Sequence, residues 1–451
     1  MEKFFKLKEH GTDVRTEVIA GLTTFMTMAY ILAVNPSVLA QTGMDSTAVL
    51  LATCIASFIG TMFMGMVANL PFALSAGMGL NAFMAYTVCG SMGYPWQAAL
   101  LAVFIEGILF IILSLTKVRE AIFDSIPIAL KKAVSVGIGL FIAFIGLQNA
   151  KLVVGGATLV QIVDFTEDFS TRGICALLAA AGTLGMIVLY IKKVPGSILL
   201  GIVGTWVLGM ICQLAGIYQP DNENWYSLFP TFKMTDFTAI RNTFGQCFDV
   251  DVSELGIFRF GVIVFSFLFV DLFDTIGTLI GVASKADMLD KDGRLPNIRP
   301  ALMADAVATT AGAVLGTSTT STFVESAAGV GAGGRTGLTS VVTALLFLAS
   351  MLFAPLFIAI PSFATAPALI FVGFLMFSSI TDIKFDAEHY TSAVPAYLCI
   401  LAMPLFYSIS EGISIGVISY VVINVLCGKA KQVNPIMYVL MVLFILKYIF
   451  L

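Results

Sequence analysis

The stretch GTSTTSTFVESAAGVGAGGRTG, residues 316–337, decides the fold, because it lies in an apolar chain but cannot form one ordinary helix. Its first half is dense in Ser and Thr, and residues 327–337 hold five glycines in eleven positions. A glycine inside a helix costs about 1 kcal/mol relative to alanine. We therefore expect an extended segment that becomes a short half-helix near Glu325. Close helix packing through small residues is the alternative interpretation.

A second stretch, PFALSAGMGLN at 71–81, shows the same irregularity. It opens with a proline, and both stretches carry Ser-Ala followed closely by Gly-x-Gly. Unwound backbone is tolerated at membrane depth only where protein or a water-filled cavity satisfies its polar groups. Two such breaks predict two half-helix N-termini that meet near the midplane and offer N–H donors to a ligand. Chance similarity between small residues is the alternative.

The composition identifies the bilayer as the solvent of this chain. Of 451 residues, 58% are hydrophobic and 12% are charged, whereas a soluble protein carries roughly 25% charged residues. A net charge of −4 gives no reason to expect a nucleic-acid partner. The polar N-terminus precedes an apolar run that is too long for a signal peptide, so the first span should remain as an anchor.

Apolar runs of spanning length divide the chain into about fourteen segments. The acidic loop 216–258 separates them into halves of about seven, and an odd number per half predicts an inverted repeat. A last run, 433–451, has no counterpart. The runs are 17–39, 47–70, 72–89, 95–115, 132–148, 172–191 and 195–215, then 260–283, 300–315, 318–332, 337–360, 366–380, 388–407 and 409–427.

Basic residues gather on alternate loops, which tests the number of spans. With the N-terminus inside, every basic cluster falls inside, and the acidic loops 150–171 and 216–258 fall outside. One missed span would put a basic cluster on the wrong side. The basic residues are Lys3, Lys6, Lys8, Arg15, Lys117, Arg119, Lys131, Lys132, Lys192, Lys193, Lys285, Lys291, Arg294, Arg299, Lys429 and Lys431.

Cysteine and histidine usage argues against several classes of site. The seven cysteines are scattered singly, without a CxxC pair, which is typical of reduced thiols packed as small apolar groups. The two histidines, His10 and His389, are far apart in the sequence. We therefore expect no histidine-based metal site, no Ser-His-Asp triad, no cofactor and no enzymatic activity.

The stretch FVDLFDTIGT, residues 269–278, carries two carboxylates inside an apolar run. A carboxylate at the bilayer centre costs roughly 2.5–3.5 kcal/mol on insertion scales. Asp271 and Asp274 are three residues apart, so we expect them on one helical face with Cβ atoms about 5–6 Å apart. A helix-packing hydrogen bond from a neutral Asp is the alternative for each, and an N-cap is the alternative for Glu325.

Asp305 is a fourth acid in an apolar run, and Asn81 follows the first break. The predicted cavity therefore holds several acceptors and almost no cations. It should repel an anion and favour a neutral, planar ligand rich in N–H groups, whose face rests on Phe323 or Phe72. Nucleobases are such ligands, and the N1–H and 2-amino edge of guanine matches one carboxylate in a bidentate way.

These motifs, together with the opening GLTTFMTMAYILAVNP, resemble the hypoxanthine–adenine–guanine permeases, a branch of the nucleobase–ascorbate transporter superfamily. The resemblance covers essentially the whole chain. It implies an all-α polytopic protein with the uracil-permease fold, in which about fourteen spans form a 7+7 inverted repeat, with short strands at broken spans 3 and 10. It implies a core domain, residues 1–120 and 259–360, and a gate domain, residues 121–258 and 361–451.

The resemblance also implies roles for single residues. Asp271 and Glu325 would bind a purine from two sides, Asn81 would shape the site, and Phe323 would stack on the base. Asp274 and Asp305 would be proton-coupling or structural partners. The backbone around Ala76, Gly77 and Ser326 would contribute N–H groups.

The function implied is import of a purine nucleobase by proton symport, through a rocking or elevator motion of core against gate. Relatives specific for xanthine and urate often carry Gln-Asn at the Glu325 position, so Glu-Ser here favours guanine or hypoxanthine, with adenine possible. We expect the cell membrane as location, a cytoplasmic N-terminus and a homodimer formed through the gate. Alternatives are an anion transporter of the same fold and, more remotely, an intramembrane aspartyl protease.

Overall fold

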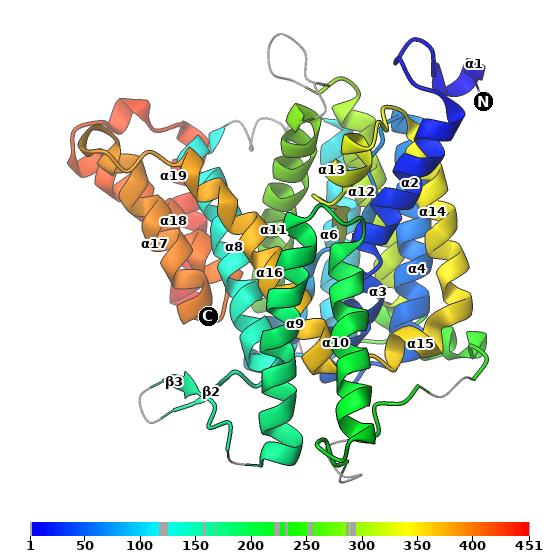
Figure 1. The fold of residues 1–451 in the computed structure, drawn as a ribbon. Helices are drawn as coiled ribbons and strands as arrows, with labels where there is room; N and C mark the ends of the chain where they lie inside the picture. Colours follow the sequence, from blue (N-terminus) through cyan, green and yellow to red (C-terminus); the bar gives the residue numbers. More distant parts are fainter. Residues whose placement is uncertain are drawn as a thin grey trace.

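The structure is a computed structural model that describes residues 2–116, 125–156, 159–166, 168–220, 226–230, 233–250, 256–285, 288 and 295–450. Within these residues the chain is a helical bundle with two short pairs of strands (Figure 1). The predicted boundary at 120/121 lies outside the described residues. So do the basic residues Lys117, Arg119, Lys291 and Arg294. Five acids of the loops 150–171 and 216–258 also lie outside: Glu167, Asp221, Glu223, Asp251 and Glu254.

Within the described residues, every predicted apolar run contains a helix, and runs 72–89 and 318–332 also contain a short strand. The first half contains α1 Glu2–Phe5, α2 Val14–Met28, α3 Ile31–Leu39, α4 Ser46–Phe63, β1 Leu74–Ala76, α5 Met78–Ala82, α6 Trp96–Leu115, α8 Ile128–Asn149, α9 Ile174–Ile191 and α10 Ser197–Leu214. The second half contains α11 Ile257–Lys285, α12 Ile298–Leu315, β4 Thr320–Thr322, α13 Ser326–Gly331, α14 Gly337–Ser350, α15 Ala354–Ile358, α16 Ser362–Phe377, α17 Tyr390–Leu405, α18 Ile409–Leu426 and α19 Pro435–Phe450.

Ten helical segments of the described chain are long and apolar enough to cross a membrane. Three of the other four predicted spans are shorter or broken. Spans 3 and 10 are interrupted by strands, and α17 has only 16 residues with two internal prolines. The fourth, span 8, is the 29-residue helix α11. The leftover run 433–451 forms α19, a 16-residue helix.

The strands expected at the two broken spans pair with each other. β1 and β4 run antiparallel, with Leu74 opposite Thr322 and Ala76 opposite Thr320. A π-helical turn, residues 83–91, continues span 3 beyond α5. A second antiparallel pair, β2 Val153–Gly155 with β3 Val160–Ile162, lies in the loop 150–171, where the sequence analysis expected no strand.

Helix packing follows the symmetry of an inverted repeat. The contact of α4 with α14 has its counterpart in the contact of α12 with α6, and α2 with α14 corresponds to α11 with α6. Helices α8 and α16 pack on each other, and so do the pairs α9–α10 and α17–α18. At the α8–α16 crossing a Cβ added to Gly139 would lie 2.7 Å from the carbonyl oxygen of Gly373, so only glycine permits this approach.

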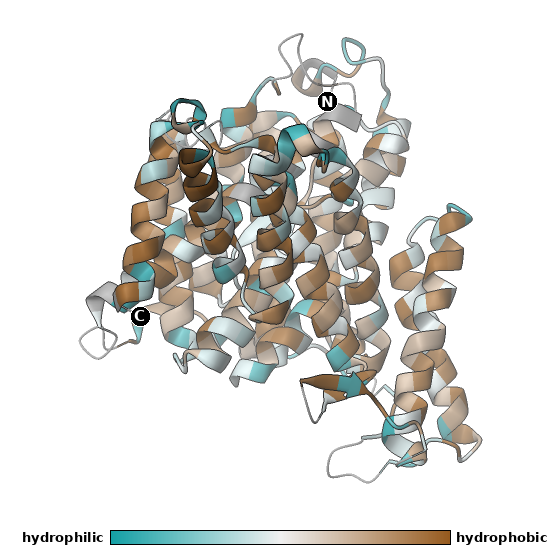
Figure 2. Cartoon of the chain, turned by 90° about the vertical axis from the view of Figure 1, so that its left-hand side faces the viewer, coloured by the Kyte–Doolittle hydropathy of each residue, from teal (hydrophilic) through white to brown (hydrophobic). Residues whose placement is uncertain are grey.

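The outer surface of the bundle is apolar. Side chains such as Ile191, Leu214 and Leu426 are 71%, 77% and 81% exposed. Figure 2 shows hydrophobic residues along the outer helices and hydrophilic residues gathered in the loops at both ends. Exposure of this extent over long helices is the pattern of a protein that faces lipid.

Polar caps fix where several helices begin. Asp13 accepts a hydrogen bond from the Thr16 amide at 2.8 Å, which starts α2 and lowers the pKa of Asp13. Glu17 in α2 is fully buried and caps a different helix. Its carboxylate accepts from the Arg335 amide at 2.9 Å and from the amide and hydroxyl of Thr339 at 3.1 and 2.6 Å. Glu17 thus ties span 1 to the start of α14.

Candidate functional site

The two interrupted spans meet at the β1–β4 pair in the middle of the bundle. Beyond the paired residues, the Gly77 amide donates to the Thr319 carbonyl at 2.9 Å, and the Phe323 amide donates to the Ala73 carbonyl at 3.0 Å. Ser326 Oγ accepts from the Ala73 amide at 3.0 Å. Three predicted site residues, Ala76, Gly77 and Ser326, therefore belong to one junction of extended backbone.

Glu325 lies at the start of α13 and is held by span 1. Tyr30 donates its hydroxyl hydrogen to Glu325 Oε1 at 2.8 Å, and the Thr27 hydroxyl donates to the Glu325 carbonyl at 3.4 Å. The ring of Phe323 lies 6.5 Å from that of Tyr30. The Glu325 side chain makes no capping hydrogen bond to α13 within the described residues, so its carboxylate is directed to Tyr30 instead.

Asp274 faces the same junction from α11. Ser321 of β4 donates to Asp274 Oδ2 at 2.9 Å. The Asp274 carboxylate also lies near the backbone of span 3, since a Cβ added to Gly77 would be 3.5 Å from Asp274 Oδ2. Two acids of the second half, one on α11 and one at the start of α13, thus lie beside the junction of the broken spans.

Asp271 lies in a different network, with Asp305 of α12. The hydroxyl of Thr275 is 3.0 Å from Asp271 Oδ1 and 2.9 Å from Asp305 Oδ2. All three side chains are fully buried. A hydroxyl has one hydrogen to donate, so one of the two contacts is satisfied best when that carboxyl carries a proton and donates it to Thr275.

Asn81 sits just behind the junction. Its Oδ1 accepts from the Ser318 hydroxyl, and its buried Nδ2 has no hydrogen-bond partner among the described residues. A buried amide donor of this kind is costly unless a ligand or water accepts from it. Asn35 binds the neighbouring residues Thr53 and Thr317 at 2.7 and 3.0 Å.

Two residues of this region, Tyr30 and Glu106, were not predicted from the sequence. Tyr30 had no distinguishing pattern, because it lies between two apolar helices. Glu106 is a fully buried acid in α6 that accepts from the Thr319 hydroxyl at 2.8 Å. A single acid in an apolar run was the signal used for Asp305, and the same signal would have found Glu106.

Asp271 and Asp274 were predicted to share one face of their helix, but in α11 they have different neighbours. Residues three apart differ by about 60° around a helix, which is enough to direct Asp274 to β4 and Asp271 to α12. Carboxylates outnumber cations at this site. Arg335 lies beyond α13, where its guanidinium donates to the Val330 and Gly334 carbonyls at 2.7 and 2.8 Å.

Comparison with known proteins places this arrangement in a family. Residues 15–415 match the Permease family. The chain belongs to this family, within the nucleobase–ascorbate transporter superfamily. This permease is 48% identical to a putative permease of Methanocaldococcus jannaschii, over 100% of the chain and 98% of the relative. It is 43% identical to the guanine/hypoxanthine permease PbuG of Bacillus subtilis, over 100% of both, and 40% identical to the adenine permease AdeQ of Escherichia coli, over 100% of the chain and 96% of the relative.

The fold of this permease is also found in a solved transporter. The transmembrane domain of the cyanobacterial bicarbonate transporter BicA superposes with a TM-score of 0.62, over 88% of this chain and 97% of that one, at 16% identity. The permease is a multi-pass membrane protein with the uracil-permease-like fold.

Proposed function

We propose that this permease imports purine nucleobases, with guanine and hypoxanthine as the first candidates and adenine as a further one. The observation that carries the proposal is that Asp274 and Glu325 both lie where the two broken spans meet, Asp274 bound to Ser321 of β4 and Glu325 at the start of α13. The guanine/hypoxanthine and adenine permeases among the relatives share the whole length of the chain, which supports the same substrate class.

The chemistry of the site fits a neutral base better than an anion. Carboxylates accept N–H groups, and two adjacent donors on the edge of a guanine pair with one carboxylate. Asp274 and Glu325 supply the acceptors, the buried Nδ2 of Asn81 is an available donor, and Phe323 offers an apolar face. An anion transporter of this fold would bring its substrate against two carboxylates, which repel it.

We further propose that the two acidic networks have separate tasks. Asp274 and Glu325 contact the base, and the Asp271–Thr275–Asp305 group holds the coupling proton. This differs from the assignment implied by resemblance, in which Asp271 binds the base. The basis is the single hydroxyl shared by two buried carboxylates, because a proton on one of them satisfies both contacts.

Transport then requires the acid-bearing helices to move against the rest. We propose the core as residues 1–120 and 259–360 and the gate as residues 121–258 and 361–451, with homodimerisation through the gate. A protonated, substrate-loaded core carries less net charge and crosses the bilayer more readily. The proposed location is the cell membrane, with a cytoplasmic N-terminus.

Uptake of radiolabelled hypoxanthine into cells that lack their own purine permeases tests the proposal. We expect saturable uptake, competition by unlabelled guanine and collapse of accumulation by a protonophore. A panel of unlabelled purines identifies the preferred base. Accumulation that persists without a proton gradient but requires sodium contradicts proton coupling, and absence of any purine uptake contradicts the substrate class. An aspartyl protease would instead cleave a transmembrane peptide, and incubation of the purified protein with such a peptide tests this alternative.

A further inference from the structure

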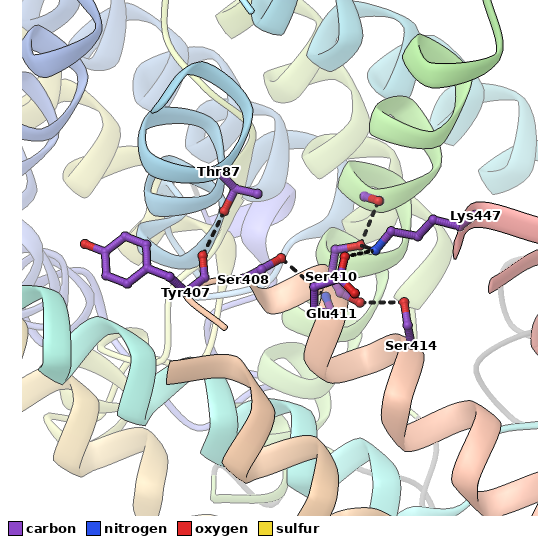
Figure 3. Close-up of polar contacts among 8 residues, drawn as sticks. Thr87, Tyr407, Ser408, Ser410, Glu411, Ser414 and Lys447 are labelled. Atoms are coloured by element: carbon purple, nitrogen blue, oxygen red, sulfur yellow. Dashed lines mark hydrogen bonds and ion pairs between the residues drawn. The ribbon is translucent and has the colours of Figure 1, made fainter. Parts of the chain in front are cut away.

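The last helix, α19, carries a buried charge that the proposed transport mechanism does not use. Lys447 is the only charged residue of α19 and is 3% exposed. Its Nζ lies 2.5 Å from Glu411 Oε1 and 2.9 Å from Ser410 Oγ, both on α18 (Figure 3). The other described ion pairs of the chain are partly exposed. A buried charge in an apolar helix is costly unless it is paired, and such residues commonly mark functional sites.

The face of α19 that carries Lys447 packs inward. Met437, Leu440, Phe444 and Lys447 follow a helical spacing and are all 5% exposed or less. The opposite face is apolar and exposed, as Val439, Val442 and Ile449 show. Lys447 therefore points away from the lipid and into the bundle.

This face of α19 contacts both the proposed gate and the proposed core. Besides α18, α19 packs against α11, the helix that carries Asp271 and Asp274. Phe444 meets Phe265 and Phe269 of α11 edge to face, each with ring centroids 5.6 Å apart. Phe269 and Asp271 are two residues apart and point to nearly opposite sides of α11. α19 thus supports the back of the helix whose front bears the acids.

The residues that Lys447 binds lie in the segment where gate meets core, residues 407–411. Ser410 Oγ is 2.9 Å from Ser266 Oγ of α11, and Thr87 of span 3 donates to the Tyr407 carbonyl at 3.2 Å. An added Cβ at Gly79 would lie 3.5 Å from Ile409 Cδ1. Tyr407 has a φ of 54°, in the left-handed region that non-glycine residues rarely adopt. Such a conformation persists only where neighbours hold it.

We propose that Lys447 is a positioning residue for transport: through Glu411 and Ser410 it holds segment 407–411 against α11 and span 3, and so sets the rate at which the core moves. This inference rests on the proposed transport function. Any displacement of α11 along the gate has to break the Ser266–Ser410 contact and slide Phe269 past Phe444. The proposal therefore concerns turnover and leaves base binding to the acidic site.

The first test uses Lys447→Met, Glu411→Gln and the double variant that carries both changes. The control is Lys431→Met, which removes an exposed lysine just before α19. A single change leaves one buried charge without its partner, so folding is checked by size-exclusion chromatography and by purine binding in detergent. The double variant leaves no lone charge. We expect it to fold and bind purine normally, with a maximal uptake rate lowered about tenfold and an unchanged KM. A folded double variant with the wild-type rate overturns the proposal.

The second test uses the pair Ser266→Cys and Ser410→Cys. We expect an oxidant to cross-link the double variant and stop its uptake, and a reductant to restore the uptake measured before oxidation. The oxidant should not change the uptake of Ser266→Cys alone or Ser410→Cys alone. Failure to cross-link, or full uptake by the cross-linked protein, contradicts the inference. Cross-linking is measured without substrate, so it is independent of the substrate class. Wild-type protein that takes up no purine contradicts the proposed function instead.

Discussion

Tyr30 acts on the site through Glu325. Its hydroxyl is the donor at 2.8 Å from Oε1, and its ring is 1% exposed, so water does not replace it readily. A hydrogen bond to a charged group contributes about 2 kcal/mol, and about 1.4 kcal/mol is a tenfold change in affinity. Loss of the hydroxyl leaves Glu325 in place but free to turn away from the base.

We therefore expect Tyr30→Phe to weaken purine binding about tenfold or more, while the protein folds and inserts normally. The measurement is KM for hypoxanthine uptake together with binding to purified protein. Tyr390→Phe is the matched control, because Tyr390 is 55% exposed and remote from the site, and it should leave both values unchanged. Equal KM for Tyr30→Phe and the wild type would show that Tyr30 does not orient Glu325.

The two acidic networks should respond differently to substitution. Glu325→Gln and Asp274→Asn should abolish both purine binding and uptake, because the lost carboxylates are the proposed acceptors. Thr275→Val keeps the side-chain shape but removes the hydroxyl between Asp271 and Asp305. It should retain binding and lose proton-driven accumulation.

Binding by purified protein and uptake with an imposed pH gradient separate these outcomes. Loss of binding in Thr275→Val would place Asp271 back in the base site. Asp271→Asn is the companion variant: we expect it to abolish uptake while base binding persists.

Single residues were predictable from the sequence where their chemistry conflicts with lipid. Asp271, Asp274, Asp305 and Glu325 were found because each is an acid in an apolar run. The side to which each acid turns was not predictable, because three residues along a helix leave about 60° of rotation that only the neighbouring helices decide. Tyr30 is unexceptional in sequence, and its importance comes from a partner 295 positions away.

The junction of β1 and β4 leaves no space for a side chain at Gly77. A Cβ added there would lie 2.7 Å from Ser321 Oγ and 3.5 Å from Asp274 Oδ2. Real Cβ atoms do not approach an oxygen at 2.7 Å, so Ser321 has to move. Because Ser321 donates to Asp274, moving Ser321 also disturbs the position of the Asp274 carboxylate.

We expect Gly77→Ala to lose most purine uptake while the bundle still folds. Gly204→Ala in α10 is the control, since nothing lies within 4 Å of the added Cβ, and it should transport normally. Uptake rate and detergent melting temperature are measured for both. A fully active Gly77→Ala protein would mean that the junction tolerates displacement of Ser321.

Elements followed from the sequence where hydrophobic length or helix-breaking residues specify them. The two strands appear where the Ser/Thr-rich and Gly-rich stretches were expected to unwind. The β2–β3 pair was not foreseen, because its residues lie in a loop without alternating apolar pattern. The helix α19 was visible as an apolar run, but its role was not, since a single lysine near the chain end does not reveal that Glu411 faces it.

For the whole molecule, the inverted repeat explains why the site lies at the centre. Two halves of opposite orientation bring their broken third spans together, and the contacts of α14 with α4 and α2 recur as those of α6 with α12 and α11. The repeat was predictable from an odd number of spans per half. The bond between Tyr30 of the first half and Glu325 of the second was not predictable, because no sequence pattern links two positions so far apart.

Orientation in the membrane is the remaining property of the whole molecule that can be tested with few changes. The N-terminus and the turn between α18 and α19 lie at one end of the bundle, and the β2–β3 pair lies at the other (Figure 1). Cys427, at the end of α18, is exposed, and Met234 in the loop after α10 is 93% exposed. Basic loops face the cytoplasm in most membrane proteins, and Lys429 and Lys431 closely follow Cys427 in the sequence.

We therefore expect a membrane-impermeant maleimide to label Cys427 in inside-out vesicles and not in intact cells. The reverse is expected for Met234→Cys in a Cys427→Ser background, because the loop that holds Met234 belongs to the opposite end. Both proteins should take up purine normally, since neither position contacts the acidic site. Labelling of Cys427 from outside intact cells would invert the topology, and with it the direction in which the proposed proton gradient drives the base.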